Sequence, residues 1–489
     1  MTSKSTKETT ALNLDKIFEN TEYYPYWLDT VRDDSILSEI VLGVPKLSGL
    51  HKTDIVIVGG GLFGMSTAYA SAKKGAKVII IDENPLEGAS INCLGAIVPG
   101  SPGDHPSHFW VHNISDEFAE TAHRASQKGI ENLVNFIRSK NLDVDLHMKG
   151  AVVSVVEDYQ KNAWMSGIGH RIVFGDRIEY SGANKNFVNS PAYHSGAVIR
   201  SNAGTLNPAK LLFNLYRKVL EKSGSIFEGK AVRVSNDLQN NILVDVEAGE
   251  KKGRIQAKQL VIATNAYTDY RNPALSYLNK KIIPVESYVI KTEPFSNAQL
   301  EESGLKQGKH YTDSNPNFNC FRLAPDNGLI FQAGASYAGR KITDSERMNS
   351  FEEKYRELQK VFGHIDKFDE LRITHAWSGV DAITPKFTPF FYQTKSTGFY
   401  YASGSSFHGI PFAFEAGKSV AKIILSGKDI RGLIPDDMDL GNYSCFLAEP
   451  QNVRSPEQWY NLWVHETKEA SSSKEAYDRY ERLSRHVKI

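Results

Sequence analysis

The segment Asp54-Ile-Val-Ile-Val-Gly-Gly-Gly-Leu-Phe-Gly64 decides the fold of this 489-residue chain. An apolar run that ends in a glycine turn and leads into apolar residues of helical spacing predicts a strand, a tight turn and a helix. Backbone N–H groups at such a turn, together with the positive end of the helix, bind the pyrophosphate of a dinucleotide. The residues that we expect to form this site are Gly59, Gly61, Leu62, Phe63 and Gly64.

A second apolar strand at residues 76–81 follows the helix, and an acidic residue, Asp82, closes it. In dinucleotide-binding units a carboxylate at this place accepts hydrogen bonds from a ribose. A glycine motif alone is a weak signal, but here the strand, the helix, the second strand and the acidic residue follow one another in the order and at the spacing of a dinucleotide-binding unit. A glycine turn in an unrelated α/β protein is the alternative, and this order and spacing argue against it. The motif by itself does not distinguish FAD from NAD.

Composition is typical of a globular protein with two or three domains. Hydrophobic residues make up 41% and charged residues 23%, and the formal net charge is zero, so we expect neither nucleic acid nor an anionic membrane as a partner. The three cysteines are far apart, which favours a reducing compartment over a disulfide framework. The first 15 residues lack the apolar core of a signal peptide, and no run approaches the ~18 apolar residues of a membrane span. We therefore predict a cytoplasmic protein without an integral membrane segment.

Later segments carry a more specific pattern. The segments are Gly88-Ala-Ser-Ile-Asn-Cys-Leu-Gly95, Val261-Ile-Ala-Thr-Asn-Ala-Tyr-Thr268, Trp377-Ser-Gly379 and Gly404-Ser-Ser-Phe-His-Gly409. Together they resemble the D-amino-acid oxidase superfamily of FAD-dependent amine and amino-acid oxidoreductases, which includes glycine oxidase and sarcosine oxidase. The pattern is most similar to the branch typified by γ-glutamylputrescine oxidoreductase, in which Tyr24-Pro-Tyr-Trp27 and Phe321-Arg-Leu-Ala-Pro325 also have counterparts. The resemblance covers roughly residues 22–430.

The resemblance implies FAD as the cofactor. The small-residue loop at 88–95 would run under the ribityl chain and the ring, the backbone of Val232 would meet the adenine, and the helix after His408 would bring its N-terminus to the pyrimidine edge of the ring. The family usually has glycine where this chain has Phe407, which would narrow the pocket. The further cofactor residues implied are Glu83, Gly88, Ala89, Ser90, Asn92, Leu94, Gly95, Val232, Thr264, Asn265, Trp377, Gly379, Gly404, Phe407, His408 and Gly409.

Two residues are candidates for contact with a substrate. Arg322 lies on the strand that faces the flavin in relatives, where a guanidinium can hold a carboxylate bidentately; a structural ion pair with Asp313 or Asp381 is the alternative. His408 either contacts the flavin or the substrate, or packs beside glycine. The strand at 329–334 has no lysine where the sarcosine oxidase branch has one that activates oxygen, so the electron acceptor is either oxygen or another molecule.

Three further features have structural interpretations that we favour. His105, His108 and His112 have a suggestive spacing, but Pro106 interrupts it and no nearby acid or cysteine completes a metal site; we expect a loop at the pocket entrance. Cys93 is interpreted as a small buried residue rather than as a point of covalent flavin attachment. The aromatic cluster Tyr23, Tyr24, Tyr26 and Trp27 is expected to pack on the surface of a domain.

The fold class that we predict is mixed α/β, with a Rossmann-like FAD-binding domain that includes a β-meander and a substrate domain built on an antiparallel sheet. We expect helices at 115–142, from Asn207, at 350–362 and at 473–487, and a hairpin around Asp326-Asn-Gly328. The predicted divisions are an arm at 1–50, an FAD-binding domain at 51–100, 196–275 and 376–430, a substrate domain at 101–195 and 276–375, and an extension at 431–489 that packs on the body or on a partner subunit.

Our hypothesis is an oxidoreductase that acts on a C–N bond of a small amine or amino acid. A hydride would pass to flavin N5, giving an imine that water hydrolyses, and the substrate nitrogen must be unprotonated because an ammonium has no lone pair to push electrons. The alternatives are a flavin monooxygenase or reductase fed by NAD(P)H, and a catalytically silent flavin-binding protein.

Overall fold

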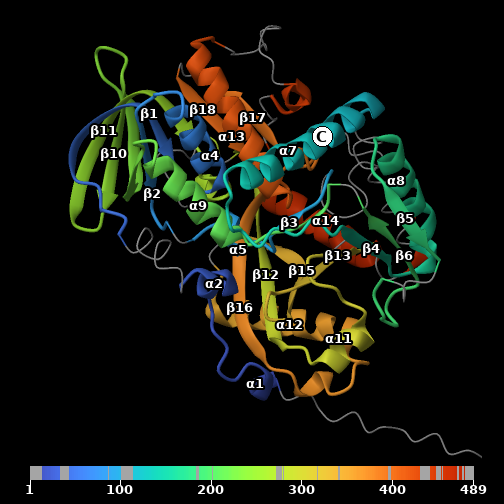
Figure 1. The fold of residues 1–489 in the computed structure, drawn as a ribbon. Coiled ribbons are helices and arrows are strands. Elements are labelled where there is room, and N and C mark those ends of the chain that lie inside the picture. The colour runs from blue at the N-terminus through green and yellow to red at the C-terminus, as the bar shows by residue number, and fades with distance from the viewer. Residues whose placement is uncertain are drawn as a thin grey trace, which may run out of the picture.

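The computed structural model describes residues 14–32, 43–85, 87–100, 114–182, 187–200, 202–270, 278, 280–315, 318–339, 342–394, 398–429, 441–447, 453, 455–470, 473–475 and 478. Two large sheets form its framework (Figure 1). His105, His108 and His112 lie outside the described residues, as does most of the helix predicted at 473–487.

The first sheet carries the predicted dinucleotide unit, and its strand order is β17-β18-β11-β1-β2-β8, with β10 and β9 added beside β11. β1 pairs in parallel with both β2 and β11, so the carboxyl ends of these strands meet at one edge. The strands are β1 (Gly49–Val58), β2 (Val78–Asp82), β8 (Ser225–Glu228), β9 (Lys230–Asn236), β10 (Ile242–Ala248), β11 (Lys251–Ile262), β17 (Phe390–Gln393) and β18 (Phe399–Ser403).

Helices cover this sheet because its central strands are apolar on both faces, as is typical of parallel sheets. Helix α4 follows the glycine turn and packs against α13 and α9, while α7 packs against α13 (Figure 1). A Cβ atom on Gly417 would lie 2.6 Å from the Cβ of Ser66, so glycine lets α13 lie close on α4. These helices are α4 (Leu62–Ala72), α7 (Asp116–Ser139), α9 (Pro208–Leu220) and α13 (Gly409–Ser426).

The second sheet has the order β16-β12-β15-β14-β13-β4-β6-β5 and is antiparallel except where β13 meets β4. Helix α12 packs on β12 and β15. The elements of this half are β4 (Ala151–Val155), α8 (Lys161–Val173), β5 (Ile178–Ser181), β6 (Ser195–Ile199), β12 (Ile283–Pro294), α11 (Asn297–Ser303), β13 (His310–Asp313), β14 (Asn319–Leu323), β15 (Gly328–Tyr337), α12 (Asp344–Phe362) and β16 (Ile373–Ile383).

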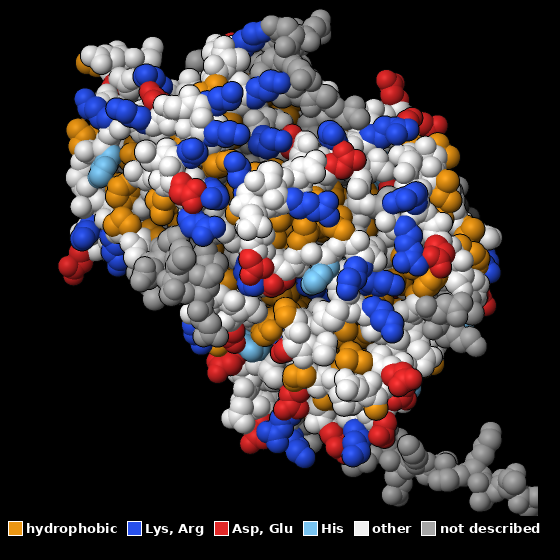
Figure 2. All heavy atoms as spheres, viewed as in Figure 1, with side chains coloured by type: hydrophobic (Ala, Val, Ile, Leu, Met, Phe, Trp, Pro, Cys, Tyr) orange, Lys and Arg blue, Asp and Glu red, His pale blue; other side chains and the backbone are white. Residues whose placement is uncertain are grey.

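Short elements complete the described chain. They are α1 (Leu14–Ile17), η1 (Tyr26–Leu28), α2 (Asp29–Arg32), α5 (Ala89–Asn92), β3 (Ala96–Ile97), η2 (Asp158–Gln160), β7 (Gly204–Thr205), α10 (Tyr267–Tyr270), η5 (Phe368–Glu370), η6 (Gly441–Phe446) and α14 (Pro456–Ala470). Among the described residues, no helix has the length and apolar character that crossing a membrane requires. On the face drawn in Figure 2, both basic and acidic side chains are spread over the surface.

Local signals in the sequence explain several element boundaries. Helix α7 begins after Ser115, whose Oγ accepts a hydrogen bond from the N–H of Phe118, and α9 begins after Asn207, whose Oδ1 accepts one from the N–H of Lys210. Such N-caps satisfy N–H groups that the helix itself leaves unpaired. The predicted helices at 115 and 207 and the hairpin around Asp326-Asn-Gly328 are confirmed.

Other elements differ from the predictions. The short apolar runs with Gly and Asn at residues 150–200 suggest strands and loops, but the segment includes helix α8, whose two glycines and β-branched residues weaken the helical signal. The prediction at 350–362 misses the start of α12, which a capping box between Thr343 and Glu346 places at Asp344. Helix α14 was not predicted; it packs on β12 and β15, and the hydroxyl of Tyr460 donates to the carbonyl of Ala335.

The chain passes between the two sheets more than once, as a discontinuous domain requires. Strand β16 pairs with β12 in the second sheet, so the return to the first sheet follows residue 383 and not residue 376 as we predicted. Likewise, β6 pairs with β4 in the second sheet, although the prediction assigns residues from 196 onward to the FAD-binding domain. The other domain boundaries stay predictions.

Candidate cofactor and active site

A cavity of about 310 Å3 opens where the carboxyl ends of β1, β2 and β11 face strands of the second sheet. Ligands of parallel α/β sheets bind at this end of the strands, and the volume lies at the lower end of the range for small-molecule sites. The predicted residues that line the cavity are Gly59, Gly61, Leu62, Phe63, Asp82, Glu83, Gly88, Ala89, Ser90, Asn92, Leu94, Thr264, Asn265, Gly379, Phe407, His408 and Gly409.

The remaining predicted residues lie behind the wall. Gly64, Gly95, Val232, Trp377, Gly404 and Arg322 do not line the cavity. Ala231 lines it in place of its neighbour Val232. Trp377 and Gly64 instead support residues of the wall, as their contacts show below.

The glycine turn brings helix α4 to the edge of the cavity. Gly59 has a φ of +109°, and a Cβ atom there would lie 2.5 Å from the carbonyl oxygen of Ala263. A Cβ atom on Gly64 would lie 2.0 Å from the carbonyl oxygen of Gly59, so only glycine lets the helix pack on the turn. The N-terminus of α4, whose first N–H groups have no partner within the helix itself, therefore faces the cavity at Gly61.

Asp82 lies beside this turn at the end of β2. Its Oδ2 accepts a hydrogen bond of 2.5 Å from the N–H of Gly60, and its Oδ1 accepts one of 2.8 Å from the N–H of Asn84. Burial raises the pKa of the Asp82 carboxyl to about 6, against the effect of these two backbone donors. The carboxylate is therefore a poorly solvated acceptor in the cavity wall.

Side chains from distant segments hold the loop at residues 88–95. The indole Nε1–H of Trp377 donates to the carbonyl of Asn92 at 2.9 Å, and that of Trp27 donates to the carbonyl of Cys93 at 2.9 Å. Arg322 donates from an Nη to the next carbonyl, that of Leu94, at 3.1 Å. Three consecutive carbonyls of the loop thus accept hydrogen bonds from three different parts of the chain.

The structure contradicts the carboxylate-binding role predicted for Arg322. Its side chain is buried, and one Nη donates to the carbonyls of Leu94 and Leu206, the latter at 2.7 Å. Neither Asp313 nor Asp381, the ion-pair partners considered as the alternative, is bonded to it; both carboxylates accept other donors. Cys320 on the same strand lines the cavity, whereas Arg322 lies two residues further along, beneath the loop. Strand β14 thus reaches the cavity through Cys320 and not through Arg322.

Trp27 also differs from its prediction. Its side chain is fully buried, with the guanidinium carbon of Arg322 5.1 Å from its ring centroid. The aromatic cluster therefore does not simply pack on a domain surface. Sequence reasoning missed this role because the aromatic residues precede β1 and no local pattern links them to the loop.

Asp381, near the end of β16, connects several segments of the cavity wall. Its Oδ1 accepts hydrogen bonds from Asn265 Nδ2 at 3.0 Å and from Ser405 Oγ at 2.6 Å, and its Oδ2 accepts one from the N–H of Phe407 at 2.8 Å. Ser403 Oγ donates to Asn265 Oδ1. This carboxylate, which we did not predict as a site residue, fixes the turn that leads into α13. A charged residue within an otherwise mostly apolar strand was the available signal.

Phe407 lines the cavity in an unusual backbone conformation. Its φ is +69° and that of Ser406 is +49°, in the left-handed region that costs residues other than glycine roughly 1–2 kcal/mol. The hydrogen bond from its N–H to Asp381 helps to hold the turn. Its ring contacts Phe318 edge to face with centroids 5.9 Å apart, and both rings line the cavity. Phe407 stands where the resemblance leads us to expect glycine, and with Phe318 it gives the cavity an aromatic wall.

Two histidines face the cavity as neutral imidazoles. His408 precedes the first residue of α13, and burial lowers its pKa to about 3. Burial also lowers the pKa of His310, on β13, to about 3, and its Nδ1 has no hydrogen-bond partner among the described residues. Both line the cavity. No sequence motif marks His310, which the fold of the second sheet brings to this place.

The N-terminus of α13 forms another part of the wall, with Gly409 to Ala413 lining the cavity. Its first N–H groups and the positive end of the helix dipole favour negative charge. Cys93 also lines the cavity, and burial raises its pKa to about 11, so its thiol is a weak nucleophile. None of the three cysteines forms a disulfide.

Residues 54–423 match the model of the DAO family, described as FAD dependent oxidoreductase. The chain belongs to this family. It is 26% identical to the "Probable oxidoreductase OrdL" of Haemophilus influenzae over an alignment of 396 residues, and this alignment covers 79% of the chain and 86% of that protein. It is 25% identical over 386 residues to the γ-glutamylputrescine oxidoreductase of Escherichia coli, covering 76% and 83% respectively.

The fold of this FAD-dependent oxidoreductase is similar to that of solved structures. Glycine oxidase from Geobacillus kaustophilus aligns with a TM-score of 0.62 and 17% identity, covering 80% of this chain and 98% of that one. The mixed α/β fold, the assignment to the family and the FAD cofactor that we predicted are thereby confirmed.

The cavity wall fits FAD on its own chemistry. Two helix N-termini, of α4 and α13, face the cavity, and Asn92 Oδ1 is a buried acceptor without a partner among the described residues. Gly61 leaves open the space at the start of α4, where a Cβ atom would lie 3.1 Å from Ser90 Oγ. We expect the α4 turn to hold the pyrophosphate, Asp82 the ribose, and the loop at 88–95 with α13 the flavin part.

The raised pKa of Asp82 predicts that FAD binding depends on pH. Hydroxyl donors of a ribose favour the charged carboxylate and so lower its pKa below about 6. Binding therefore releases a proton, and affinity rises with pH until the free carboxyl is ionised. Between pH 7 and pH 5 we expect the Kd of FAD to increase about tenfold.

Quenching of flavin fluorescence during titration of the FAD-free protein measures this effect. The Asp82→Asn variant should bind FAD more weakly and with a Kd that does not change over the same pH range. A wild-type Kd that is equal at pH 5 and pH 7 would contradict the prediction.

Proposed function

We propose that this FAD-dependent oxidoreductase oxidises a C–N bond of a small amine or amino acid. The observation that carries the proposal is the pair of neutral imidazoles, His310 and His408, in the cavity wall. The names of the similar proteins, γ-glutamylputrescine oxidoreductase and glycine oxidase, support the same class of substrate.

Neutral imidazoles suit the chemistry because the substrate nitrogen must lose its proton before reaction. A buried environment disfavours an ammonium unless a negative charge balances it. Arg171, which also lines the cavity, forms a 3.1 Å ion pair with the buried Asp176, so its charge is balanced within the protein. His310 and His408 can hydrogen-bond polar groups of the substrate without adding charge.

FAD, when bound, would accept the two electrons of the oxidation as one hydride. The α-carbon then loses its C–H bond, the nitrogen lone pair forms the C=N bond, a proton leaves the nitrogen, and water hydrolyses the imine to a carbonyl compound and an amine. The N-terminus of α13 would stabilise negative charge in the cavity by up to ~2 kcal/mol. The chain thus contributes orientation, exclusion of water and electrostatic stabilisation, without a strong general base.

The electron acceptor and the cellular location belong to the proposal as well. Strand β15 contributes Gln332, and not a lysine, to the cavity wall. The buried Lys291, on strand β12, forms an ion pair with Asp326 and does not line the cavity. We propose that either oxygen or another acceptor reoxidises the flavin, and that the protein works in the cytoplasm, where its three cysteines stay reduced thiols.

Anaerobic mixing of the purified yellow protein with a panel of amines and amino acids tests the function. We expect at least one of them to bleach the flavin absorbance, and NADPH alone to leave it unchanged. Readmission of oxygen, compared with addition of a redox dye, then distinguishes the acceptors. Bleaching by NADPH but by no amine would favour a monooxygenase or reductase, and a flavin that no donor reduces would favour a silent binding protein.

A further inference from the structure

We propose that Trp27, in the N-terminal arm, is a positioning residue of the cofactor site and that FAD affinity depends on its indole N–H. The inference rests on FAD occupying the cavity that the loop at 88–95 lines. Trp27 lies outside residues 54–423, which match the family model. Together with Trp377 and Arg322 it would hold the loop in the shape that receives the cofactor.

The loop itself has little local preference for one shape. Gly88 and Gly95, near its two ends, have φ values of +112° and +70°, a region that favours glycine. Between them lie mostly small residues, with only the short helix α5 (Ala89–Asn92). Long-range hydrogen bonds to the carbonyls of Asn92, Cys93 and Leu94 must therefore define the backbone path.

The side chains of the same loop face the cavity. Ser90 Oγ accepts a hydrogen bond of 2.9 Å from the N–H of Leu62, at the start of α4, and Asn92 Oδ1 is an unpartnered acceptor in the cavity wall. A shift of the carbonyls would move these groups relative to the phosphate-binding turn. Trp27 acts on the loop directly, through Cys93, and also by stacking on Arg322, which bonds the carbonyl of Leu94.

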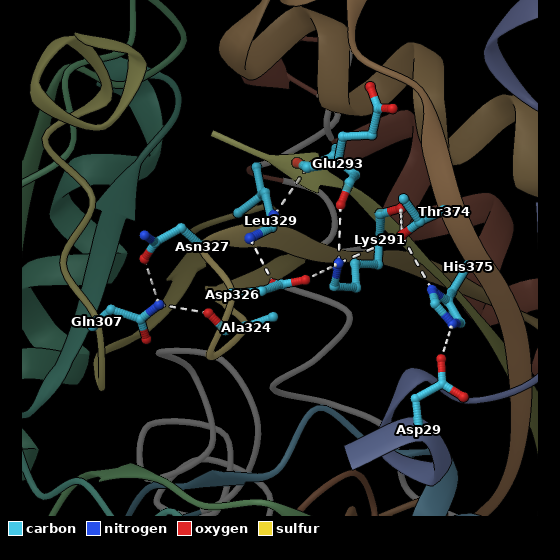
Figure 3. Close-up of polar contacts among 12 residues, drawn as sticks. Asp29, Lys291, Glu293, Gln307, Ala324, Asp326, Asn327, Leu329, Thr374 and His375 are labelled. Atoms are coloured by element: carbon cyan, nitrogen blue, oxygen red, sulfur yellow. Dashed lines mark hydrogen bonds and ion pairs between the residues drawn. The ribbon is translucent and has the colours of Figure 1, made fainter. Parts of the chain in front are cut away.

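The arm is attached to the second sheet, so Trp27 connects that sheet to the loop. Figure 3 shows Asp29 beside His375, with Oδ2 and Nε2 2.9 Å apart, and Lys291 bonded to Asp326. The ring of Tyr26 lies edge to face with that of His375. The Nζ of Lys291 lies 4.5 Å from the centroid of the Tyr26 ring. Two backbone hydrogen bonds between Glu22 and strand β16 complete the attachment: the N–H of Glu22 donates to the carbonyl of Thr374, and the N–H of Ala376 donates to the carbonyl of Glu22.

Replacement of Trp27 by phenylalanine removes the N–H donor and keeps most of the ring. A buried acceptor left without its partner is costly, and we expect the Kd of FAD to rise about tenfold in W27F. W377F should give an increase of similar size. The matched control is W164F, because Trp164 is also fully buried but its Nε1 has no partner among the described residues; its Kd should equal that of the wild type.

Fluorescence titration with FAD and the thermal midpoint of the FAD-free protein are measured for each full-length variant. A raised Kd in W27F with a midpoint equal to that of W164F supports the inference, and a Kd equal to wild type overturns it. If W27F does not fold, Asp29→Asn, which weakens the attachment to His375, should raise the Kd two- to threefold, and no change there overturns the inference. A wild-type protein that binds no FAD would refute the cofactor assignment itself.

Discussion

Replacing Gly61 by valine is expected to abolish FAD binding while the fold stays intact. The φ of Gly61 is −70° and its ψ is −178°, an extended conformation that valine adopts without strain. Its Cβ atom would point to the cavity at 3.1 Å from Ser90 Oγ, and the two methyl groups would occupy the space where a phosphate approaches the N-terminus of α4. We expect the Kd of FAD to rise by at least ~1,000-fold, or about 4 kcal/mol.

The flavin content of the purified variant and its titration with FAD measure this loss, and circular dichroism shows whether the fold is retained. Gly169→Ala is the control, since Gly169 lies in helix α8 and a Cβ atom there meets nothing within 4 Å. This control should keep its flavin and be slightly stabilised, because alanine favours a helix. A yellow G61V protein with wild-type affinity would refute the phosphate site.

Replacing Asp381 by alanine is expected to slow flavin reduction by an amine about 100-fold while FAD stays bound. The carboxylate accepts hydrogen bonds from Asn265, Ser405 and the N–H of Phe407. Without it, the left-handed conformation of Phe407 loses one of its supports, and the turn into His408 and α13 can relax. Reacting groups must be held within about 1 Å, so a shift of this wall acts mainly on the reaction rate.

Anaerobic stopped-flow measurement of flavin bleaching gives the rate, and the absorbance ratio of flavin to protein gives the occupancy. Asp245→Ala is the control, because it removes a carboxylate with two arginine partners from the β-meander, where Asp245 does not line the cavity. Its rate should equal that of the wild type. If D381A reduces its flavin at the wild-type rate, the turn does not depend on this carboxylate.

The accuracy of the sequence predictions follows the range of the interactions involved. The glycine turn, Asp82, the loop at 88–95 and the helix after His408 depend on backbone geometry within a few residues, and each of them meets the cavity. Arg322 and Trp27 illustrate the opposite case. Their residue types suggested a ligand contact and a surface patch, but their hydrogen bonds go to carbonyls on a loop more than 60 residues away.

His310 was missed because no motif near it in the sequence indicates a site, and Asp381 because a single charge in a mostly apolar strand does not show which segments it bonds. β13 and β16 lie in the same sheet with three other strands between them, and only this strand order brings both residues to one cavity. Burial then sets the chemistry, since it lowers the pKa of His310 to about 3.

By itself, the sequence determined the dinucleotide turn and the mixed α/β fold, because glycine conformations and apolar periodicity act locally and leave a readable pattern. The FAD-binding family followed from the resemblance of its later motifs to those of known enzymes. The tertiary structure decided which polar side chains face the cavity and which ones support its wall. Strand order, the position of a residue along its strand, and the hydrogen bonds to a glycine-flanked loop make that selection, and all three depend on residues that are distant in the chain.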